Sequence, residues 1–315
     1  MRESTTSYVV LIPTYERPMS LKNVLESLLL QECPPTHIFV CDASMPATFA
    51  LVQEVCQMST IPTTLIMSDR PSIPHQRNLL INAVRQKKPE TQKVLFLDDD
   101  TIPKLEYGSI LIQVLNDAGD TCVGASGVTN RPQKSKLINF AGWIFLHSGL
   151  PGSVLPSGVN VPVNTFQKSI QKTEWIFGCS MWRFGVFNEF AFPDDWRGYA
   201  KGEDVYFSYQ VSSRYSLFVA PTAILTNSSD ATDVVFSYDR GLQTIENRYK
   251  LCKILRRNQF LVNISFIWST FGSLIFAFLM FIRKPGSLRL DYLRGISRGL
   301  VVTLMRYKRA GLPKI

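Results

Sequence analysis

Short apolar runs alternate with helix-like segments over the first third of the chain, and this alternation restricts the fold more than any other feature. Tyr8–Ile12 is a continuous β-branched and apolar run that Pro13 ends, which is typical of a strand buried on both faces. The next segment is a predicted helix, because its apolar residues recur at helical spacing: Leu21, Val24, Leu25, Leu28 and Leu29. Ser20 is the expected N-cap of that helix, and Pro34 stops it.

The same order recurs along the chain. Strands are expected over His37–Cys41, Thr63–Met67, Lys93–Leu97, Thr121–Ser126, Glu174–Trp182 and Leu217–Ala220, and helices over Ala47–Met58, Pro74–Arg85, Tyr107–Asn116 and Gly202–Ser212. The stretch from Gly149 to Pro162 is rich in Gly, Pro and Ser and is expected to be a loop or lid. The pattern predicts an α/β fold with a mainly parallel sheet, helices on both faces, and ligands beyond the carboxyl ends of the strands.

Polar loops follow three of these strands, over residues 13–18, 42–44 and 98–100. In the third, an apolar strand runs directly into Asp98, Asp99 and Asp100. Adjacent like charges repel unless a cation joins them, and Mg²⁺ or Mn²⁺ accepts carboxylate oxygens while also binding phosphate. The run therefore indicates a metal-assisted diphosphate site, and an acidic turn that caps the next helix is the alternative.

A second acidic pair, Glu203-Asp204, follows Gly202 after an aromatic and glycine-rich stretch that begins at Phe177. Acids at the start of a helix are favoured by the helix dipole, so the pair by itself is more typical of a cap than of a catalyst. Its importance comes from the segments that precede it in the chain.

Taken in order, these segments resemble the family-two glycosyltransferases of the GT-A fold, a Rossmann-like fold, over residues 9–226. Leu11–Arg17 is similar to the opening nucleotide loop, and Val40–Ser44 is similar to the segment that contacts the base. Gln76-Arg77-Asn78 is similar to the third element, and Asp98–Asp100 resembles the DxD motif. Each segment is common, but their order is specific.

The fifth segment joins Phe177–Met181 to Gly198-Tyr199 and Gly202–Val205, and it resembles the acceptor-side segment that ends in the family's catalytic acid pair. The resemblance implies that Asp204 is the general base, with Glu203 as the second candidate. It also implies four residues on the acceptor side: Gly178, Cys179, Trp196 and Gly202.

The same resemblance implies a set of donor-binding residues: Pro13, Thr14, Tyr15, Glu16, Arg17, Asp42, Arg77, Asp98 and Asp99. Asp42 would accept a hydrogen bond from a pyrimidine base, and a simple turn residue is the alternative. Arg77 would contact the diphosphate or the acids, and a surface charge on a helix is the alternative. Asp98 would face the ribose or the sugar and, with Asp100, would hold Mn²⁺ or Mg²⁺.

One feature departs from the family pattern, because many relatives place a metal-binding His after the last strand. Ile224–Ser228 occupies that region here, and no His follows His147. Either Asn227 or water would take the position, or metal binding is weaker, since an amide oxygen is a poorer ligand than imidazole for transition metals. Structural or solvated roles are expected for His37, His75 and His147.

The C-terminal tail carries the positive charge. From Arg256 to the end there are eleven Lys/Arg and one acid, so the tail has a charge of +10 and residues 1–255 have −1. Phe260–Ile282 contains 23 uncharged residues, which is long enough for a helix to cross a bilayer. Basic residues flank this run on both sides, so the positive-inside rule gives no orientation, and Leu300–Met305 is a second apolar patch.

A re-entrant or interfacial pair of helices that binds anionic lipids accounts for both apolar patches, whereas the core helix of a soluble protein is the alternative. Nucleic acid is not expected as a partner, because basic residues would then spread over a folded face. The expected domains are a GT-A catalytic domain, residues 1–255, and membrane-anchoring helices, residues 256–315. Lys250–Arg257 would be the hinge between them.

The six cysteines are widely spaced and form no CxxC pair, which argues against a zinc site or a disulfide framework and favours a reducing compartment. The N-terminal residues show no apolar signal segment. We therefore expect a membrane-associated protein with its catalytic domain on the cytoplasmic side.

The resemblance implies an inverting sugar transfer in glycan or polysaccharide synthesis. The donor would be a nucleotide diphosphate sugar, with UDP preferred, and the acceptor a hydroxyl of a lipid-linked or membrane-proximal glycan. A nucleotidyltransferase is a weaker alternative, because it would normally show a glycine-rich phosphate loop, and Pro13–Arg17 contains no glycine. A catalytically inactive membrane scaffold would explain the missing His but not the intact acids.

Overall fold

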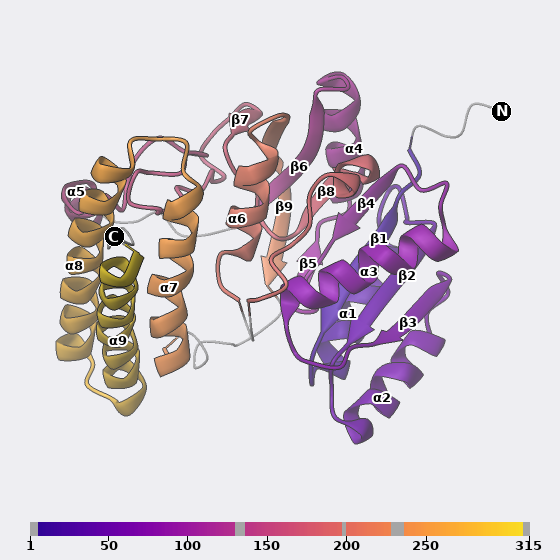
Figure 1. Cartoon of the computed structure of the whole chain (residues 1–315). Helices are drawn as coiled ribbons and strands as arrows, with labels where there is room; N and C mark the ends of the chain where they lie inside the picture. The colour runs from indigo at the N-terminus through magenta and orange to yellow at the C-terminus, as the bar shows by residue number, and fades with distance from the viewer. Residues whose placement is uncertain (1–5, 130–135, 197–199, 228–235, 311–315) are drawn as a thin grey trace. The chain divides into compact units, whose positions relative to one another are not determined.

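The computed structural model describes residues 6–129, 136–196, 200–227 and 236–310 (Figure 1). Its contacts divide the chain into two compact units, which are described separately. The sheet unit comprises residues 1–132, 162–199 and 203–229. The helical unit comprises residues 133–161, 200–202 and 230–315.

The described strands of the sheet unit form one mixed sheet. They are β1 (Val9–Thr14), β2 (His37–Asp42), β3 (Thr63–Met67), β4 (Lys93–Phe96), β5 (Thr101–Pro103), β6 (Cys122–Thr129), β7 (Gln171–Thr173), β8 (Ser180–Arg183) and β9 (Ser216–Asn227). Their order is β3-β2-β1-β4-β8-β6-β9-β5, and β7 pairs with β9. The pairs among β1 to β4 are parallel, whereas β8 is antiparallel to both of its neighbours. The expected α/β sheet is confirmed.

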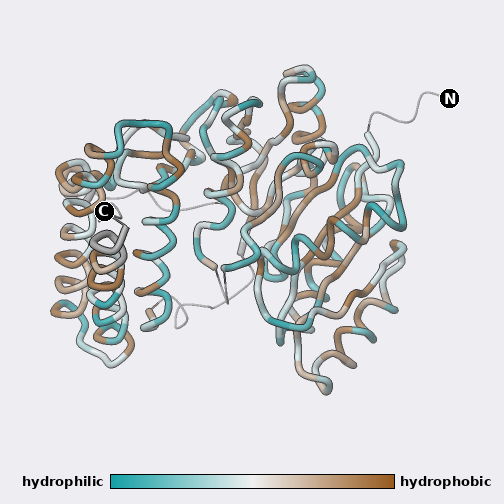
Figure 2. The backbone as a smooth tube through the Cα atoms, viewed as in Figure 1, coloured by the Kyte–Doolittle hydropathy of each residue, from teal (hydrophilic) through white to brown (hydrophobic). Residues whose placement is uncertain are grey.

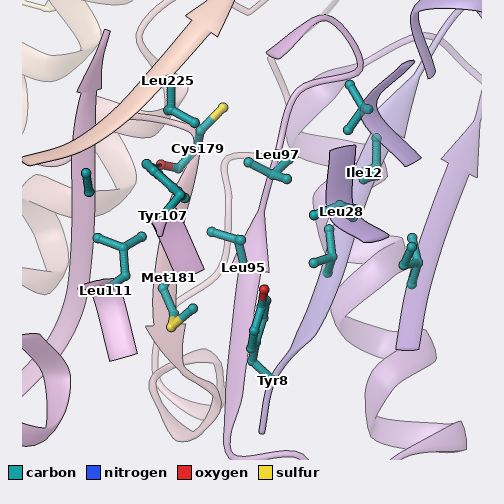
Figure 3. Packing of buried hydrophobic residues seen from close by; sticks show 14 of the residues in the cluster. Tyr8, Ile12, Leu28, Leu95, Leu97, Tyr107, Leu111, Cys179, Met181 and Leu225 are labelled. Atoms are coloured by element: carbon teal, nitrogen blue, oxygen red, sulfur yellow. Dashed lines mark hydrogen bonds between the residues drawn. The ribbon is translucent and has the colours of Figure 1, made fainter. Parts of the chain in front are cut away.

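Helices cover both faces of this sheet: α1 (Pro18–Leu29), α2 (Pro46–Gln57), α3 (Ile73–Lys87), α4 (Tyr107–Asp117) and α6 (Glu203–Val211), with a short 3₁₀ helix, η1 (Phe184–Asn188). Side chains alternate along β1, so that Val10 and Ile12 pack with α1 and α4, while Val9 and Leu11 pack with α3 and α6. Figure 3 shows part of the first cluster, in which Tyr8 and Leu28 lie near Leu95. Burial on both faces explains why β1 and β4 read as continuous apolar runs.

Three expectations about local structure are corrected. Ser20 is not the N-cap of α1, because the helix begins at Pro18, which can occupy the first turn since it needs no hydrogen bond there. The strand expected over Glu174–Trp182 forms only at the end of that range, where β8 begins at Ser180, and the short strand β7 ends at Thr173, before the range. The strand expected over Leu217–Ala220 is longer, and it continues through β9 to pair with β5, which the sequence did not indicate.

The helical unit contains α5 (Lys136–Ile144), α7 (Tyr238–Ile254), α8 (Gln259–Arg283) and α9 (Ser287–Ala310). Two glycines let α7 and α9 pack backbone to backbone, because a Cβ on Gly241 would strike the carbonyl of Tyr292 and one on Gly295 would strike that of Tyr238. Asn258 caps α8 by accepting hydrogen bonds from the backbone N–H groups of Phe260 and Leu261. Figure 2 shows α8 as mainly hydrophobic and α7 as largely hydrophilic.

The helix α7, which ends at Ile254, therefore belongs to the same compact unit as the C-terminal helices and not to the sheet unit. Residues 133–161 also belong to the helical unit, and they include α5, which was not predicted, and most of the loop expected from Gly149 to Pro162. The functional division into catalytic residues 1–255 and anchoring residues 256–315 stays a prediction.

Candidate active site

The acidic loop begins where β4 ends, at the carboxyl edge of the sheet. Leu97 continues the strand direction by donating its N–H to the carbonyl of Leu11 on β1. Asp98 donates its backbone N–H to the Sγ atom of Cys179, at 3.4 Å, just before β8 begins. The loop is thus anchored on both sides, and its three carboxylates lie where an α/β sheet normally binds ligands.

Arg77 on α3 joins two of the expected acids. Its Nη1 atom lies 2.9 and 3.1 Å from the two carboxylate oxygens of Glu203, and its Nη2 atom lies 3.3 Å from Asp98 Oδ1. The guanidinium stands 5.3 Å from the ring centroids of both Phe96 and Phe192, which favours a cation. Only 2% of Arg77 is exposed, so it is not a surface helix charge. Arg77 is instead the buried centre of the acid cluster.

Arg17 and Thr14 hold the other two carboxylates from the end of β1. Arg17 Nη1 lies 3.2 Å from Asp99 Oδ1 and 2.8 Å from Asp100 Oδ2. Thr14 donates its hydroxyl to Asp99 Oδ2 at 2.8 Å. Burial raises the pKa of Asp99 to about 6 despite these partners. Two arginines therefore supply the positive charge that three adjacent acids require.

The loop after β1 turns sharply through Glu16, which has a φ of 56°. The carboxylate of Glu16 accepts hydrogen bonds from the N–H of Met45 and the hydroxyl of Thr48, each at 2.6 Å, and these bonds lower its pKa. Its own N–H donates to Ser44 Oγ at 2.6 Å. The preceding Tyr15 is 46% exposed. Glu16 therefore shapes this loop against the next one and leaves the ring of Tyr15 available to a ligand.

Asp42, at the end of β2, is fully buried. Its Oδ1 atom accepts hydrogen bonds from the N–H and the hydroxyl of Ser44, at 3.0 and 2.6 Å, as a turn residue would. Its Oδ2 atom is also buried but has no hydrogen-bond partner among the residues that the structure describes. Burial raises the pKa of Asp42. A buried acceptor without a donor is rare in native proteins, so the turn role explains only one of the two oxygens.

Gln76 is a structural member of the site to which the sequence analysis gave no role. Its Nε2 atom donates to the carbonyls of Thr14 and Cys41, at 2.9 and 2.8 Å, and so ties the ends of β1 and β2 together. It precedes Arg77 on α3, so one helix turn positions both the strand ends and the acid cluster. Its place beside Arg77 in the third segment was the only signal in the sequence.

The two acids that begin α6 have different surroundings. Glu203 is 6% exposed, and both of its carboxylate oxygens accept hydrogen bonds from Arg77. Burial raises its pKa to about 8, although Arg77 opposes that rise. Asp204 is bound by backbone N–H groups, from Val205 at 2.8 Å and from Gly178, and burial raises its pKa as well. Among the described residues Asp204 has no ion pair within hydrogen-bonding distance, so it is the less engaged of the two carboxylates.

The N-terminal part of the chain matches a known family. Residues 6–148 match the family model described as "Glycosyltransferase like family 2". Over these residues the chain is similar to the family-two glycosyltransferases. No curated protein sequence matches it.

Two solved structures show the fold of this glycosyltransferase. The mannosyltransferase PcManGT from Pyrobaculum calidifontis, in complex with GDP-Man and Mn²⁺, is 14% identical with a TM-score of 0.57, over 93% of this chain and 86% of that chain. S. aureus TarS 1-349, in complex with UDP-GlcNAc, is 13% identical with a TM-score of 0.54, over 92% of this chain and 79% of that chain. The fold is therefore GT-A.

The residues expected on the acceptor side are two glycines and two buried side chains. Gly178 is required next to Arg77, since a Cβ there would lie 2.8 Å from Arg77 Nη2, and Gly202 has a φ of 87°. Cys179 is fully buried, and Trp196 is 3% exposed. Their side chains therefore support the site from within. Arg197, Gly198 and Tyr199 lie outside the described residues.

The carboxylates of the acidic loop suit a metal ion that is also bound to the phosphates of a substrate. Among the described residues, no three His, Cys, Asp or Glu side chains are grouped so as to hold a metal by themselves. Asp98 and Asp100 nevertheless present carboxylates that are 36% and 22% exposed, and Mg²⁺ is commonly held by one or two carboxylates together with substrate phosphates. The side chain of Asn227, expected in place of the missing His, lies outside the described part.

The three histidines of this glycosyltransferase all have partners elsewhere. His37 contacts Thr64 Oγ1 at 2.9 Å, and His75 contacts Asp69 and Asp194 at 2.9 and 2.7 Å. His147 contacts the carbonyl of Ser269 at 2.8 Å. These contacts fit the structural roles expected for them.

Proposed function

We propose that this glycosyltransferase transfers a sugar, with inversion, from a nucleotide diphosphate sugar to a hydroxyl of a lipid-linked or membrane-proximal glycan. The observation that carries this proposal is the convergence of two distant acidic segments at one sheet edge, where Arg17 and Arg77 hold residues 98–100 and Arg77 also holds Glu203. Asp42, which is buried with one oxygen unpartnered among the described residues, lies at the same edge. Such a site can bind a nucleotide base and a diphosphate and can supply a proton acceptor, all at one edge of the sheet.

The nucleotide base binds at Asp42 in this proposal. The unpartnered Oδ2 atom of Asp42 can accept a hydrogen bond from an imino N–H of uracil, while Ser44 keeps Oδ1 in place. The exposed ring of Tyr15 is available to stack on the base. PcManGT was solved with GDP-Man and TarS with UDP-GlcNAc, so nucleotide donors suit the fold. We favour UDP because Asp42 offers an acceptor to the pyrimidine imino group.

The chemistry requires a base on the acceptor side. Asp204 takes the proton of the acceptor hydroxyl, the hydroxyl oxygen bonds to the anomeric carbon, and the bond from that carbon to the diphosphate breaks with its electron pair leaving on phosphate. Glu203 is paired on both oxygens by Arg77, so its role is to position Arg77. Mn²⁺ or Mg²⁺, held by Asp98 and Asp100, would stabilise the charge of the leaving diphosphate.

Helix α8 provides the membrane contact. It is the one described helix that is long and apolar enough to cross a bilayer, and its outer side exposes apolar residues: Phe260, Leu261, Ile264, Ile267, Trp268, Phe271, Phe278, Leu279 and Ile282. Yet Thr270, in the middle of α8, accepts a hydrogen bond from Arg248 on α7 at 2.6 Å. A spanning α8 would place that charge and the hydrophilic α7 near the bilayer centre, which is strongly unfavourable.

We therefore propose that α8 lies in the membrane interface on the cytoplasmic side. Its apolar side faces the acyl chains, and the basic residues at its ends, such as Arg257 and Lys284, meet anionic headgroups. Flotation with phosphatidylglycerol vesicles tests this placement. Wild type should float with the vesicles and leave them at high pH in carbonate, whereas resistance to carbonate would show that α8 spans the bilayer.

Titration calorimetry with UDP, GDP and CDP in the presence of Mn²⁺ tests the donor site. UDP should bind most tightly, and Asp42→Ala should weaken it about 10-fold or more, the value of one charged hydrogen bond of about 1.5–3 kcal/mol. Asp69→Ala, an exposed acid elsewhere in the sheet unit, is the matched control and should bind UDP normally. Absence of binding by all three nucleotides would contradict the proposed function.

A further inference from the structure

Asn78 lies next to Arg77 on α3, and its side chain holds both backbone groups of one distant residue. Its Nδ2 atom donates to the carbonyl of Phe192 at 3.0 Å, and its Oδ1 atom accepts the N–H of Phe192 at 3.1 Å. A side-chain amide offers a donor and an acceptor together, as the peptide group of a neighbouring strand does. Asn78 therefore fixes the main chain of Phe192 against α3, across 114 residues of sequence.

The ring of Phe192 packs against two elements of the acid cluster. It is 4% exposed, and the guanidinium carbon of Arg77 lies 5.3 Å from its centroid. It also stacks on the ring of Phe207, with the centroids 4.1 Å apart and the planes inclined by 17°. Phe207 stands four residues after Glu203 on α6, so the two side chains lie on the same side of that helix. Phe192 thus touches the arginine of the cluster and the helix that carries its acid pair.

The next residues of this segment are also tied to α3 or to the loop before it. Arg70 Nη2 donates to Asp194 Oδ2 at 2.9 Å, and the hydroxyl of Ser72 donates to the carbonyl of Trp196 at 2.8 Å. The first contact is an ion pair between two exposed side chains, which contributes little to stability. The tie at Asn78 differs from both, because it holds the residue of the segment whose ring touches the acid cluster.

Losing the amide of Asn78 would release the ring of Phe192. The two backbone groups would bond to water, and the ring would be free to move away from Arg77 and from α6. Arg77 binds Glu203 through bonds of 2.9 and 3.1 Å, and that geometry depends on the packing around the guanidinium. Glu203 and Asp204 are consecutive residues, so a shift of Glu203 also moves Asp204. A displacement of about 1 Å in an active site can slow the chemical step by about 100-fold.

We propose that Asn78 is a positioning residue of the transfer reaction. It acts through Phe192, whose ring fixes Arg77 and the start of α6 and so places Asp204 for proton transfer. That the effect appears in sugar transfer rests on the proposed function. The base subsite at Asp42 is shaped by other contacts, so the loss should appear in kcat and not in the affinity for the nucleotide.

Nucleotide release by the full chain in detergent tests this role, with Mn²⁺, water as the acceptor and the UDP-sugar that wild type turns over fastest. Asn78→Ala should lower kcat about 10- to 100-fold and leave the UDP affinity in EDTA unchanged. Asn78→Asp keeps the size and the acceptor but loses the donor, so it should lower kcat as well. Arg85→Ala is the matched control, because Arg85 also donates from α3 to a backbone carbonyl, that of Phe187, and it should keep the wild-type kcat.

A double-mutant cycle shows whether Asn78 acts through Phe192. Phe192→Leu removes the ring but keeps the backbone that Asn78 holds, and it should lower kcat by a similar factor. The double variant should be no slower than the slower single variant, because both changes break one link. Wild-type kcat in Asn78→Ala, or losses that multiply in the double variant, would overturn the proposal.

Urea unfolding supplies a second cycle that needs no substrate. The proposal links Asn78 to Glu203 through Phe192 and Arg77, so Asn78→Ala should lose less unfolding free energy in a Glu203→Gln background than in wild type. If wild type releases no nucleotide from any donor, the proposed function fails, and this cycle alone decides the positioning role. Losses of unfolding free energy that simply add would then overturn it.

Discussion

Replacing Arg77 with Met tests whether one buried cation holds the acid cluster together. Arg77 is 2% exposed, and it lies 2.9 Å from Glu203 Oε1 and 3.3 Å from Asp98 Oδ1. Met fills much of the same space between Phe96 and Phe192 but carries no charge. The buried carboxylate of Glu203 would therefore lose its counter-charge while the packing around it is largely kept.

The expected loss of stability depends on pH. Removing one partner of a buried ion pair costs about 3–5 kcal/mol, so Arg77→Met should lose that much unfolding free energy at about pH 9. Burial already raises the pKa of Glu203 to about 8. At about pH 6 Glu203 is protonated, and the loss should fall to about 1–3 kcal/mol, the cost of an unsatisfied neutral group.

Urea unfolding followed by tryptophan fluorescence at both pH values measures these losses. Lys87→Met removes an exposed cation from the same helix and should change stability by less than about 0.5 kcal/mol. A variant of Arg77 as stable as the Lys87 control at high pH, or a loss that does not change with pH, would refute the reasoning.

Two other predictions concern the acids. Asp100→Ala should abolish the gain in UDP affinity that Mn²⁺ gives to wild type. Calorimetry of wild type and variant, each with Mn²⁺ and with EDTA, measures this gain. The same affinity under all four conditions would exclude a diphosphate bridged by metal. The folded pKa of Glu203 is raised from 4.5 to about 8, so its stabilising contribution is complete below the lower value and is lost as pH rises through the higher one. Glu203→Gln should therefore flatten the fall in unfolding free energy across this range, and an unchanged slope would assign the titration to another group.

The sequence predicted the local elements best where burial leaves a simple pattern. Val9 to Ile12 and Lys93 to Phe96 are buried on both faces, so the strands β1 and β4 read directly from apolar runs. The acids at positions 98–100 were placed at a strand end for the same reason. The start of α1 was predicted wrongly, because the serine two residues after Pro18 is a typical N-cap residue.

Long-range partners could not be predicted from local patterns. Arg77 pairs with Glu203 across 126 residues, and its position on α3 looks like one charge among several on a helix. The packing of α7 on α9 depends on Gly241 and Gly295, whose lack of a side chain is visible only when the two backbones meet. Cys179 supports the acidic loop through its thiol, which no spacing in the sequence indicates.

The central claim is that this glycosyltransferase uses Asp204 to activate the attacking hydroxyl. Nucleotide release from a panel of UDP-sugars and GDP-sugars in Mn²⁺, with water as the attacking hydroxyl when no acceptor is added, tests it most directly. Wild type should release UDP from at least one donor, and Asp204→Asn should slow that release by about 10²–10⁴-fold while its UDP affinity stays unchanged. Release at the wild-type rate by Asp204→Asn, or no release from any donor by wild type, would contradict the account.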